Sequence, residues 1–168
     1  TVLSGTAVAI LAGCETLASS GAANADTMAD DARILNTALG AELEAIAAYQ
    51  VGAESGLLSK GVLDVAVKFQ GHHKEHADVL SKTVTKLGGV PVGPLASYDF
   101  PVDKLKSEAD VLKFAAGLEK GAVSAYLGAV PLFGNRDLAK AAASILGDEA
   151  MHWAVLRGAL GLDPVPGA

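Results

Sequence analysis

Two stretches of this chain repeat each other without a gap, 77 positions apart. Residues 35–42 read LNTALGAE, residues 112–119 read LKFAAGLE, and the match continues as far as Tyr49 and Tyr126. In both copies a glutamate stands seven residues before the tyrosine, so the two side chains share one face of a helix. One helical hairpin used twice predicts an all-α four-helix bundle with a pseudo-two-fold axis.

The other two helical stretches, 61–87 and 141–160, repeat each other less closely, at an offset of 76. Glu149 and His152 lie three residues apart, which places both on one helix face, where they can bind one metal ion together. An apolar helix face is otherwise a poor place for a charge, because an unpaired buried charge costs several kcal/mol. The ligand-type residues that align at this offset are His73 with Glu149 and His76 with His152.

Composition supports a bundle and excludes several other classes of protein. The 168 residues suit a single domain, and 51% hydrophobic with only 5% aromatic residues suits a core of Ala, Leu and Val. The net charge of −6, with scattered Lys and Arg, gives no basic patch, so no nucleic-acid partner is expected. The single cysteine, Cys14, excludes an internal disulfide and a thiolate metal cluster.

Residues 1–25 look different from the rest of the chain. A short apolar run of small residues, 2–12, is followed by Ser, Gly, Ala and Asn, as in a signal peptide or a flexible leader. Residues 11–14 read LAGC and resemble the lipobox of bacterial lipoproteins, which predicts export to the periplasm or cell envelope and membrane attachment through lipidated Cys14. The alternative is an N-terminal helix packed on the bundle, and the bundle domain itself is expected over 26–168.

The helix boundaries follow from capping residues, glycines and prolines. The first helix is expected to start at Asp30 and Asp31 and to end at Gly52 or Gly56. Ser59 is expected to cap the second helix, and a capping box is expected over 107–110 for the third. Between them, 89–106 carries three prolines and is long for a connection, which predicts a crossover along the bundle.

Such a bundle brings a ligand-type residue from each of four helices to one depth in the core. The arrangement resembles the ferritin-like superfamily, in which two helices each give a Glu and two give Glu-x-x-His to hold two iron or manganese ions. The resemblance spans residues from about 30 to 160, and the LNTAL opening with the Glu42-to-Tyr49 spacing is most similar to the exported bacterial ferritin-like and desiccation-related branch. The metal ligands that it implies are Glu42, His73, His76, Glu119, Glu149 and His152, supported by Tyr49, Tyr126 and His72.

One position departs from the family pattern, because His73 stands where the second Glu-x-x-His motif has its glutamate. In the family these two carboxylates bridge the metal ions, so here one bridge is missing. More imidazole suits zinc, copper or iron, and the 141–160 side is expected to be the stronger site. Glu44 competes with Glu42 for the inward position, and residues 72–76 could alternatively form a solvated helix face.

The candidate ligands and the His73 substitution together suggest two alternative functions. The first is a metal-binding protein that handles iron with oxygen or peroxide at a di-metal centre, with iron, manganese or zinc bound. The second is a metal-free, non-enzymatic envelope or stress-related bundle, which the His73 substitution motivates. A homodimer through the sides of the bundle is the default expectation for assembly.

Overall fold

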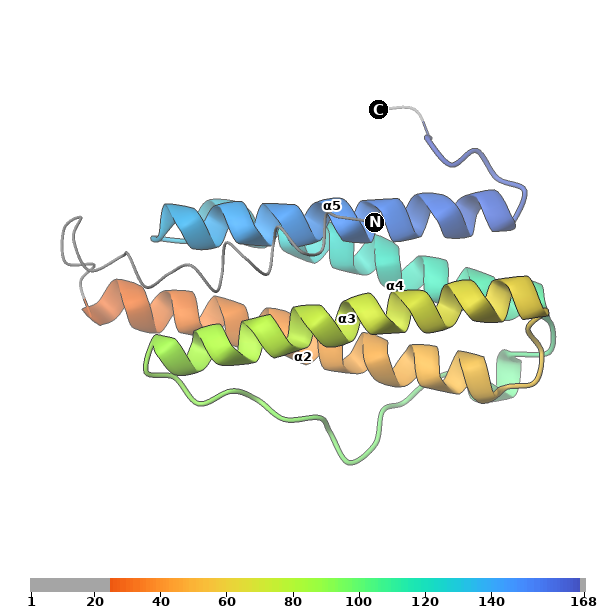
Figure 1. The fold of residues 1–168 in the computed structure, drawn as a ribbon, viewed down its shortest axis with the longest axis horizontal. Coiled ribbons are helices and arrows are strands. Elements are labelled where there is room, and N and C mark those ends of the chain that lie inside the picture. Colours follow the sequence, from red (N-terminus) through yellow and green to blue (C-terminus); the bar gives the residue numbers. More distant parts are fainter. Residues whose placement is uncertain (1–24, 167–168) are drawn as a thin grey trace.

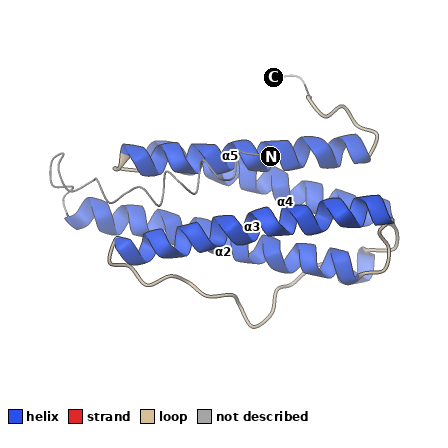
Figure 2. Ribbon diagram, viewed as in Figure 1, coloured by secondary structure: helices blue, strands red, loops and turns tan. Residues whose placement is uncertain are grey.

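Four long helices make up most of the described part of the chain, residues 25–166 of this computed structural model. Within that range the structure contains no strand, which confirms the all-α prediction (Figure 2). The lipobox with Cys14 and almost all of the leader lie outside the described residues. The helices are α2 (Ala25–Glu54), α3 (Lys60–Lys86), α4 (Glu108–Ala129) and α5 (Arg136–Ala159), with short 3-10 turns at η2 (Val102–Lys104) and η3 (Val130–Leu132).

The helices form two hairpins joined by a crossover, as the repeat predicted. Helix α2 packs along α3, and α4 packs along α5. The segment between α3 and α4 runs along the outside of the bundle from one end to the other (Figure 1). The Asn36 side chain holds this segment in place, since its amide donates to the Val90 carbonyl at 2.8 Å and its oxygen accepts the Val92 N–H at 2.9 Å.

Two of the predicted helix starts differ in how they are capped. At α4, the Ser107 hydroxyl oxygen accepts the Asp110 N–H at 3.2 Å, which confirms Ser107 as the predicted cap. The Asp110 carboxylate accepts the Lys106 N–H at 3.2 Å and the Ser107 hydroxyl at 2.7 Å. Ser59 precedes α3 as expected, but its side chain makes no capping hydrogen bond. Its backbone N–H instead donates to the Glu108 carboxylate, which ties the start of α3 to the start of α4.

The predicted start of the first helix at Asp30 and Asp31 is wrong, because α2 begins at Ala25. Asp31 is buried inside the helix, and its two carboxylate oxygens accept the N–H groups of Gly134 and Asn135 at 2.8 and 3.0 Å. Asn135 in turn caps α5. Asp31 therefore satisfies backbone donors that the turn before α5 would otherwise leave unpaired.

We predict that Asp31→Ala lowers the free energy of unfolding by about 2–3 kcal/mol, because it leaves two backbone donors without their charged acceptor. Asp30→Ala is the matched control: Asp30 is exposed and forms a surface ion pair with Arg33 within the described residues, so its removal should cost less than about 0.5 kcal/mol. Urea unfolding followed by circular dichroism measures both. Equal losses in the two variants would contradict this role for Asp31.

Two apolar clusters fill the bundle, one towards each end, and a polar layer separates them. The first includes Leu35, Leu80 and Ile145, and the second includes Phe69, Leu112 and Leu156. The buried polar residues between them lie at mid-height, where the sequence placed the ligands. No helix within residues 25–166 has the combined length and apolar character needed to cross a membrane.

Candidate metal centre

Six side chains that can ligate a metal meet in the polar layer, and each of the four helices supplies at least one. None of the six is more than 2% exposed. All six were predicted from the repeat, whereas Glu44 and Glu75 are exposed, so the structure places Glu42 inward. The six residues are Glu42, His73, His76, Glu119, Glu149 and His152.

The first ligand group joins α2, α3 and α5 and consists of Glu42, His73, His76 and Glu149, with ligand atoms within 4.8 Å of one another. The Nδ1 atom of His73 lies 2.8 Å from Oε2 of Glu42. The Nδ1 atom of His76 lies 3.5 Å from the same oxygen and 3.2 Å from Oε1 of Glu149. These ligand atoms are close enough together for one cation to be bound by all four side chains.

The second group joins α3, α4 and α5 and consists of His73, Glu119, Glu149 and His152, again with ligand atoms within 4.8 Å. The Nδ1 atom of His152 lies 3.5 Å from Oε1 of Glu119 and 3.6 Å from Oε2 of Glu149. The Nε2 atom of His73 lies 3.3 Å from Oε1 of Glu119. His73 and Glu149 belong to both groups, so they stand between the two candidate metal positions.

Two tyrosines support the carboxylates in a reciprocal way. Tyr126 on α4 donates its hydroxyl hydrogen to Oε1 of Glu42 on α2 at 2.5 Å, and Tyr49 on α2 donates to Oε1 of Glu119 on α4. Each tyrosine thus bonds the glutamate of the other copy of the repeat. This exchange is the contact expected of two hairpins related by a pseudo-two-fold axis.

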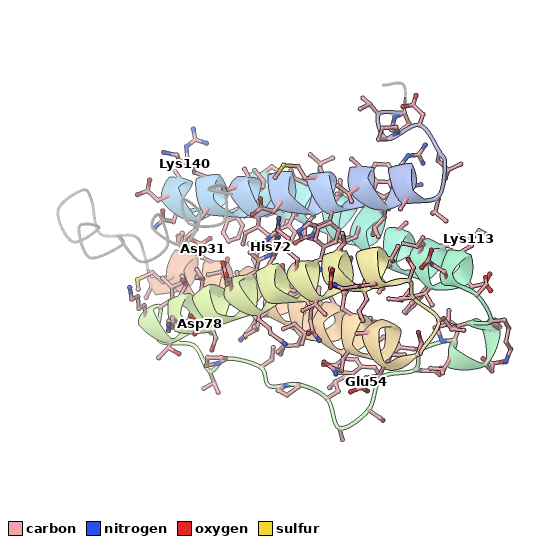
Figure 3. All side chains as sticks on the ribbon, turned by 45° about the vertical axis from the view of Figure 1, so that its right-hand side comes forward. Asp31, Glu54, His72, Asp78, Lys113 and Lys140 are labelled. Carbon is pink, nitrogen blue, oxygen red and sulfur yellow. The ribbon has the colours of Figure 1, made fainter. Side chains whose placement is uncertain are left out.

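Two further side chains fix the orientation of the histidines, and they also correspond across the repeat. The Nε2 atom of His76 lies 3.3 Å from Oδ2 of buried Asp148, so the imidazole directs Nδ1 towards the first group. His72 lies on α3 beside α5 (Figure 3), and its Nδ1 lies 2.8 Å from Nε2 of His152. His72 therefore supports His152 and is not itself in either group.

The family-level comparison agrees with this geometry. The model of a ferritin-like domain matches residues 30–162. The chain belongs to the ferritin-like family. No curated protein matches it, and the finer prediction of the exported, desiccation-related branch stays a prediction.

Solved structures with the same fold include proteins from three bacteria. A conserved hypothetical protein from Mycobacterium tuberculosis has a TM-score of 0.73 and 22% identity over 84% of this chain and 98% of its own. A structure of ferritin-like, diiron-carboxylate proteins from Bacillus anthracis has a TM-score of 0.67 and 20% identity over 80% and 97%. A dodecameric thioferritin, the bacterioferritin-related protein of Bacteroides fragilis, has a TM-score of 0.67 and 23% identity over 94% and 93%.

Helix α3 is where this ferritin-like chain leaves the family pattern. Helix α5 carries Glu149 and His152 in the Glu-x-x-His spacing, but α3 carries His73 and His76. The structure places His73 opposite Glu149, with His73 Nδ1 3.7 Å from Glu149 Oε1. An imidazole thus occupies a position that both ligand groups share.

When the six side chains contact only one another, protonated histidines balance the negative charges of the buried carboxylates. Burial opposes protonation of His73, but its contacts with Glu119 and Glu42 outweigh this effect and raise its pKa to about 10. Burial likewise opposes protonation of His76, whereas Asp148, Glu149 and Glu42 raise its pKa to about 12. Burial raises the pKa of Glu42, but contacts with His73 and His76 outweigh it and lower that pKa to about 2. Burial raises the pKa of Glu149.

Because Glu149 belongs to both groups and Glu42 to only one, their replacement should have different effects. We predict that Glu149→Gln removes about two metal equivalents, whereas Glu42→Gln removes about one and leaves the second group able to bind. Glu75→Gln on the exposed face of α3 is the control and should keep the wild-type metal content. Elemental analysis after anaerobic reconstitution measures all three. A similar loss in Glu75→Gln would show that the metal ligands do not lie on the buried face of α3.

Proposed function

We propose that this chain binds two transition-metal ions in the core of its bundle and uses them to handle iron with oxygen or peroxide. The main support is a set of buried side-chain nitrogen and oxygen atoms that lack a hydrogen-bond partner among the described residues. All of them belong to the six candidate ligands: His76 Nδ1, Glu119 Oε2, both carboxylate oxygens of Glu149 and His152 Nδ1. Buried polar atoms left without partners are costly, and an absent ion is one of the explanations for them.

The donor set fits a transition metal. Three carboxylates and three imidazoles, with no thiolate, suit iron, manganese or zinc. The diiron-carboxylate description of the Bacillus anthracis neighbour favours iron among these. A bound iron pair would supply the electrons for reaction with dioxygen or peroxide. The chain's own part is to hold the site: Asp148 and His72 fix the imidazoles of His76 and His152, and the two apolar clusters exclude bulk water.

The two groups should not bind equally well. In the first group both oxygens of Glu42 are already hydrogen-bonded, one by Tyr126 and one by His73. In the second group Glu119 keeps an unpartnered oxygen, whereas each group keeps one unpartnered imidazole nitrogen, on His76 in the first and on His152 in the second. This difference supports the prediction that the side containing Glu149 and His152 is the stronger site.

A second candidate function is a metal-free bundle in the cell envelope. His73 favours it, because its two ring nitrogens lie 2.8 Å from Glu42 and 3.3 Å from Glu119 and so close the cluster on itself. We also propose that the chain is exported, which the composition of residues 1–25 supports. Lipid attachment through Cys14 and assembly as a homodimer are further proposals. Because the Bacteroides fragilis neighbour is a dodecamer, a measurement of oligomeric state has to distinguish a homodimer from a higher oligomer.

Metal analysis of untagged protein separates the two functions. After anaerobic reconstitution with ferrous iron and desalting, we expect about two equivalents of iron per chain, with the second bound more weakly than the first. Exposure to air or peroxide should then oxidise the bound iron faster than free ferrous iron in the same buffer. Less than about a tenth of an equivalent of iron, manganese or zinc would overturn the metal-binding proposal.

Replacing His73 by Glu tests the role of the departure from the family. We predict that His73→Glu tightens binding of the second ferrous ion by about tenfold or more, because it restores a shared carboxylate. In the metal-free protein, the same change should lower the free energy of unfolding by about 3–5 kcal/mol, because it replaces a cation by an anion beside three buried carboxyl groups.

The matched control is Lys74→Glu, which adds a carboxylate to the exposed face of the same helix. It should change neither iron affinity nor metal-free stability by a comparable amount. Identical behaviour of the two variants would show that His73 has no special place in the centre.

A further inference from the structure

A groove of about 220 Å³ lies between α2 and α4, and small residues line its walls. Ala41 and Ala45 contribute from α2, and Gly117, Gly121 and Ala125 contribute from α4. These five positions are exposed or half-exposed, so the groove opens to solvent. Apart from Glu44 and Leu118, the wall residues above the floor have small side chains, which leaves the groove open.

Two members of the second ligand group form the floor of the groove. His73 and Glu119 line it, and both are buried, with Glu119 only 1% exposed. The Oε2 atom of Glu119 has no hydrogen-bond partner among the described residues. A ligand atom that lacks a protein partner thus belongs to a side chain that faces an opening to solvent.

Among the described residues, side chains cover the approaches from the α3–α5 side and from the two ends of the bundle. On the side of α3 and α5, the Phe69 ring stacks on His152 with centroids 4.0 Å apart, and His72 is hydrogen-bonded to the same imidazole. Towards the ends of the bundle lie the two apolar clusters. A separate cavity near Tyr49 is lined by apolar side chains and glycines apart from the tyrosine itself, which makes it a poor path for an ion.

The charge of the groove favours a cation. Its ionisable lining residues are Glu44, exposed on α2, and the floor residues His73 and Glu119, and no Lys or Arg lines it. The two carboxylates outnumber the single imidazole, so the lining is net negative whichever protonation state His73 has. A net negative cleft raises the local concentration of cations and speeds their association. Glu44 is exposed and belongs to neither ligand group, so it can act on a cation only at the surface.

We propose that this groove is the route by which a divalent cation reaches the centre, and that the Glu44 carboxylate captures the ion before it passes to Glu119. The inference rests on the proposed metal binding and adds the path and the residue that serves it. Glu44 is a positioning residue here, because it guides the ion without belonging to either ligand group.

A bulky side chain in the groove tests the path. A Cβ atom at Gly121 meets no other atom within 4 Å, and the same holds at Gly128, so both sites on α4 accept a Cβ atom without a backbone shift. Gly121 lines the groove and Gly128 does not. Gly121→Phe is therefore the test and Gly128→Phe the matched control, with Ala45→Leu as a second obstruction from the α2 wall.

The probe is Co²⁺ in excess, followed by its visible absorption in stopped-flow mixing. We expect Gly121→Phe and Ala45→Leu to slow association by about tenfold, with dissociation slowed in parallel, so that the equilibrium affinity stays within about twofold. Gly128→Phe should bind at the wild-type rate. Glu44→Gln should slow association about two- to fivefold at low salt, and this effect should vanish near 1 M salt.

Each outcome has a defined meaning. Wild-type association rates in Gly121→Phe and Ala45→Leu, with normal cobalt binding, would overturn the route and leave the metal centre intact. A salt-independent effect of Glu44→Gln would overturn its role as an electrostatic capture residue. Failure of the wild-type protein itself to bind cobalt, iron or zinc would overturn the proposed function and the route with it.

Discussion

The bundle depends on charge compensation at mid-height, where Glu42, Glu119 and Glu149 are buried together. Three carboxylates in an apolar core are tolerated only when cations or protons balance them. Without a metal, His73 and His76 serve this purpose, because their carboxylate contacts raise their pKa values to about 10 and about 12. A metal ion must displace these protons in order to bind, so the centre exchanges one kind of positive charge for another.

The duplication of the hairpin explains why the supporting contacts come in pairs. Tyr49 bonds Glu119 and Tyr126 bonds Glu42, so each half of the repeat completes the other. Asp148 and His72 occupy corresponding positions beside His76 and His152. A single hairpin would leave its glutamate and its tyrosine hydroxyl without these partners, which ties the site to the assembled bundle.

The repeat made the four helices and the six inward residues predictable, since matched spacing selects one face of each helix. Glu42 could be preferred over Glu44 because Gly121 stands at the position that corresponds to Glu44 in the second copy. The role of Asp31 could not be predicted from its neighbours in sequence, because its partners, Gly134 and Asn135, are about a hundred residues away. The groove was not predictable either, since it depends on how closely α2 and α4 approach each other and not on the pattern of either helix.

The asymmetry of the centre and the position of the groove point to the same half of the site. Glu42 has both oxygens engaged, while Glu119 has one without a partner, and it is Glu119 that lines the groove. His73, also on the floor, lies between the two groups. An ion that enters between α2 and α4 therefore meets the more available group first, and the contact of His73 with Glu42 has to open before a second ion can follow. The substitution that sets this chain apart from the family pattern thus lies between the first binding step and the second.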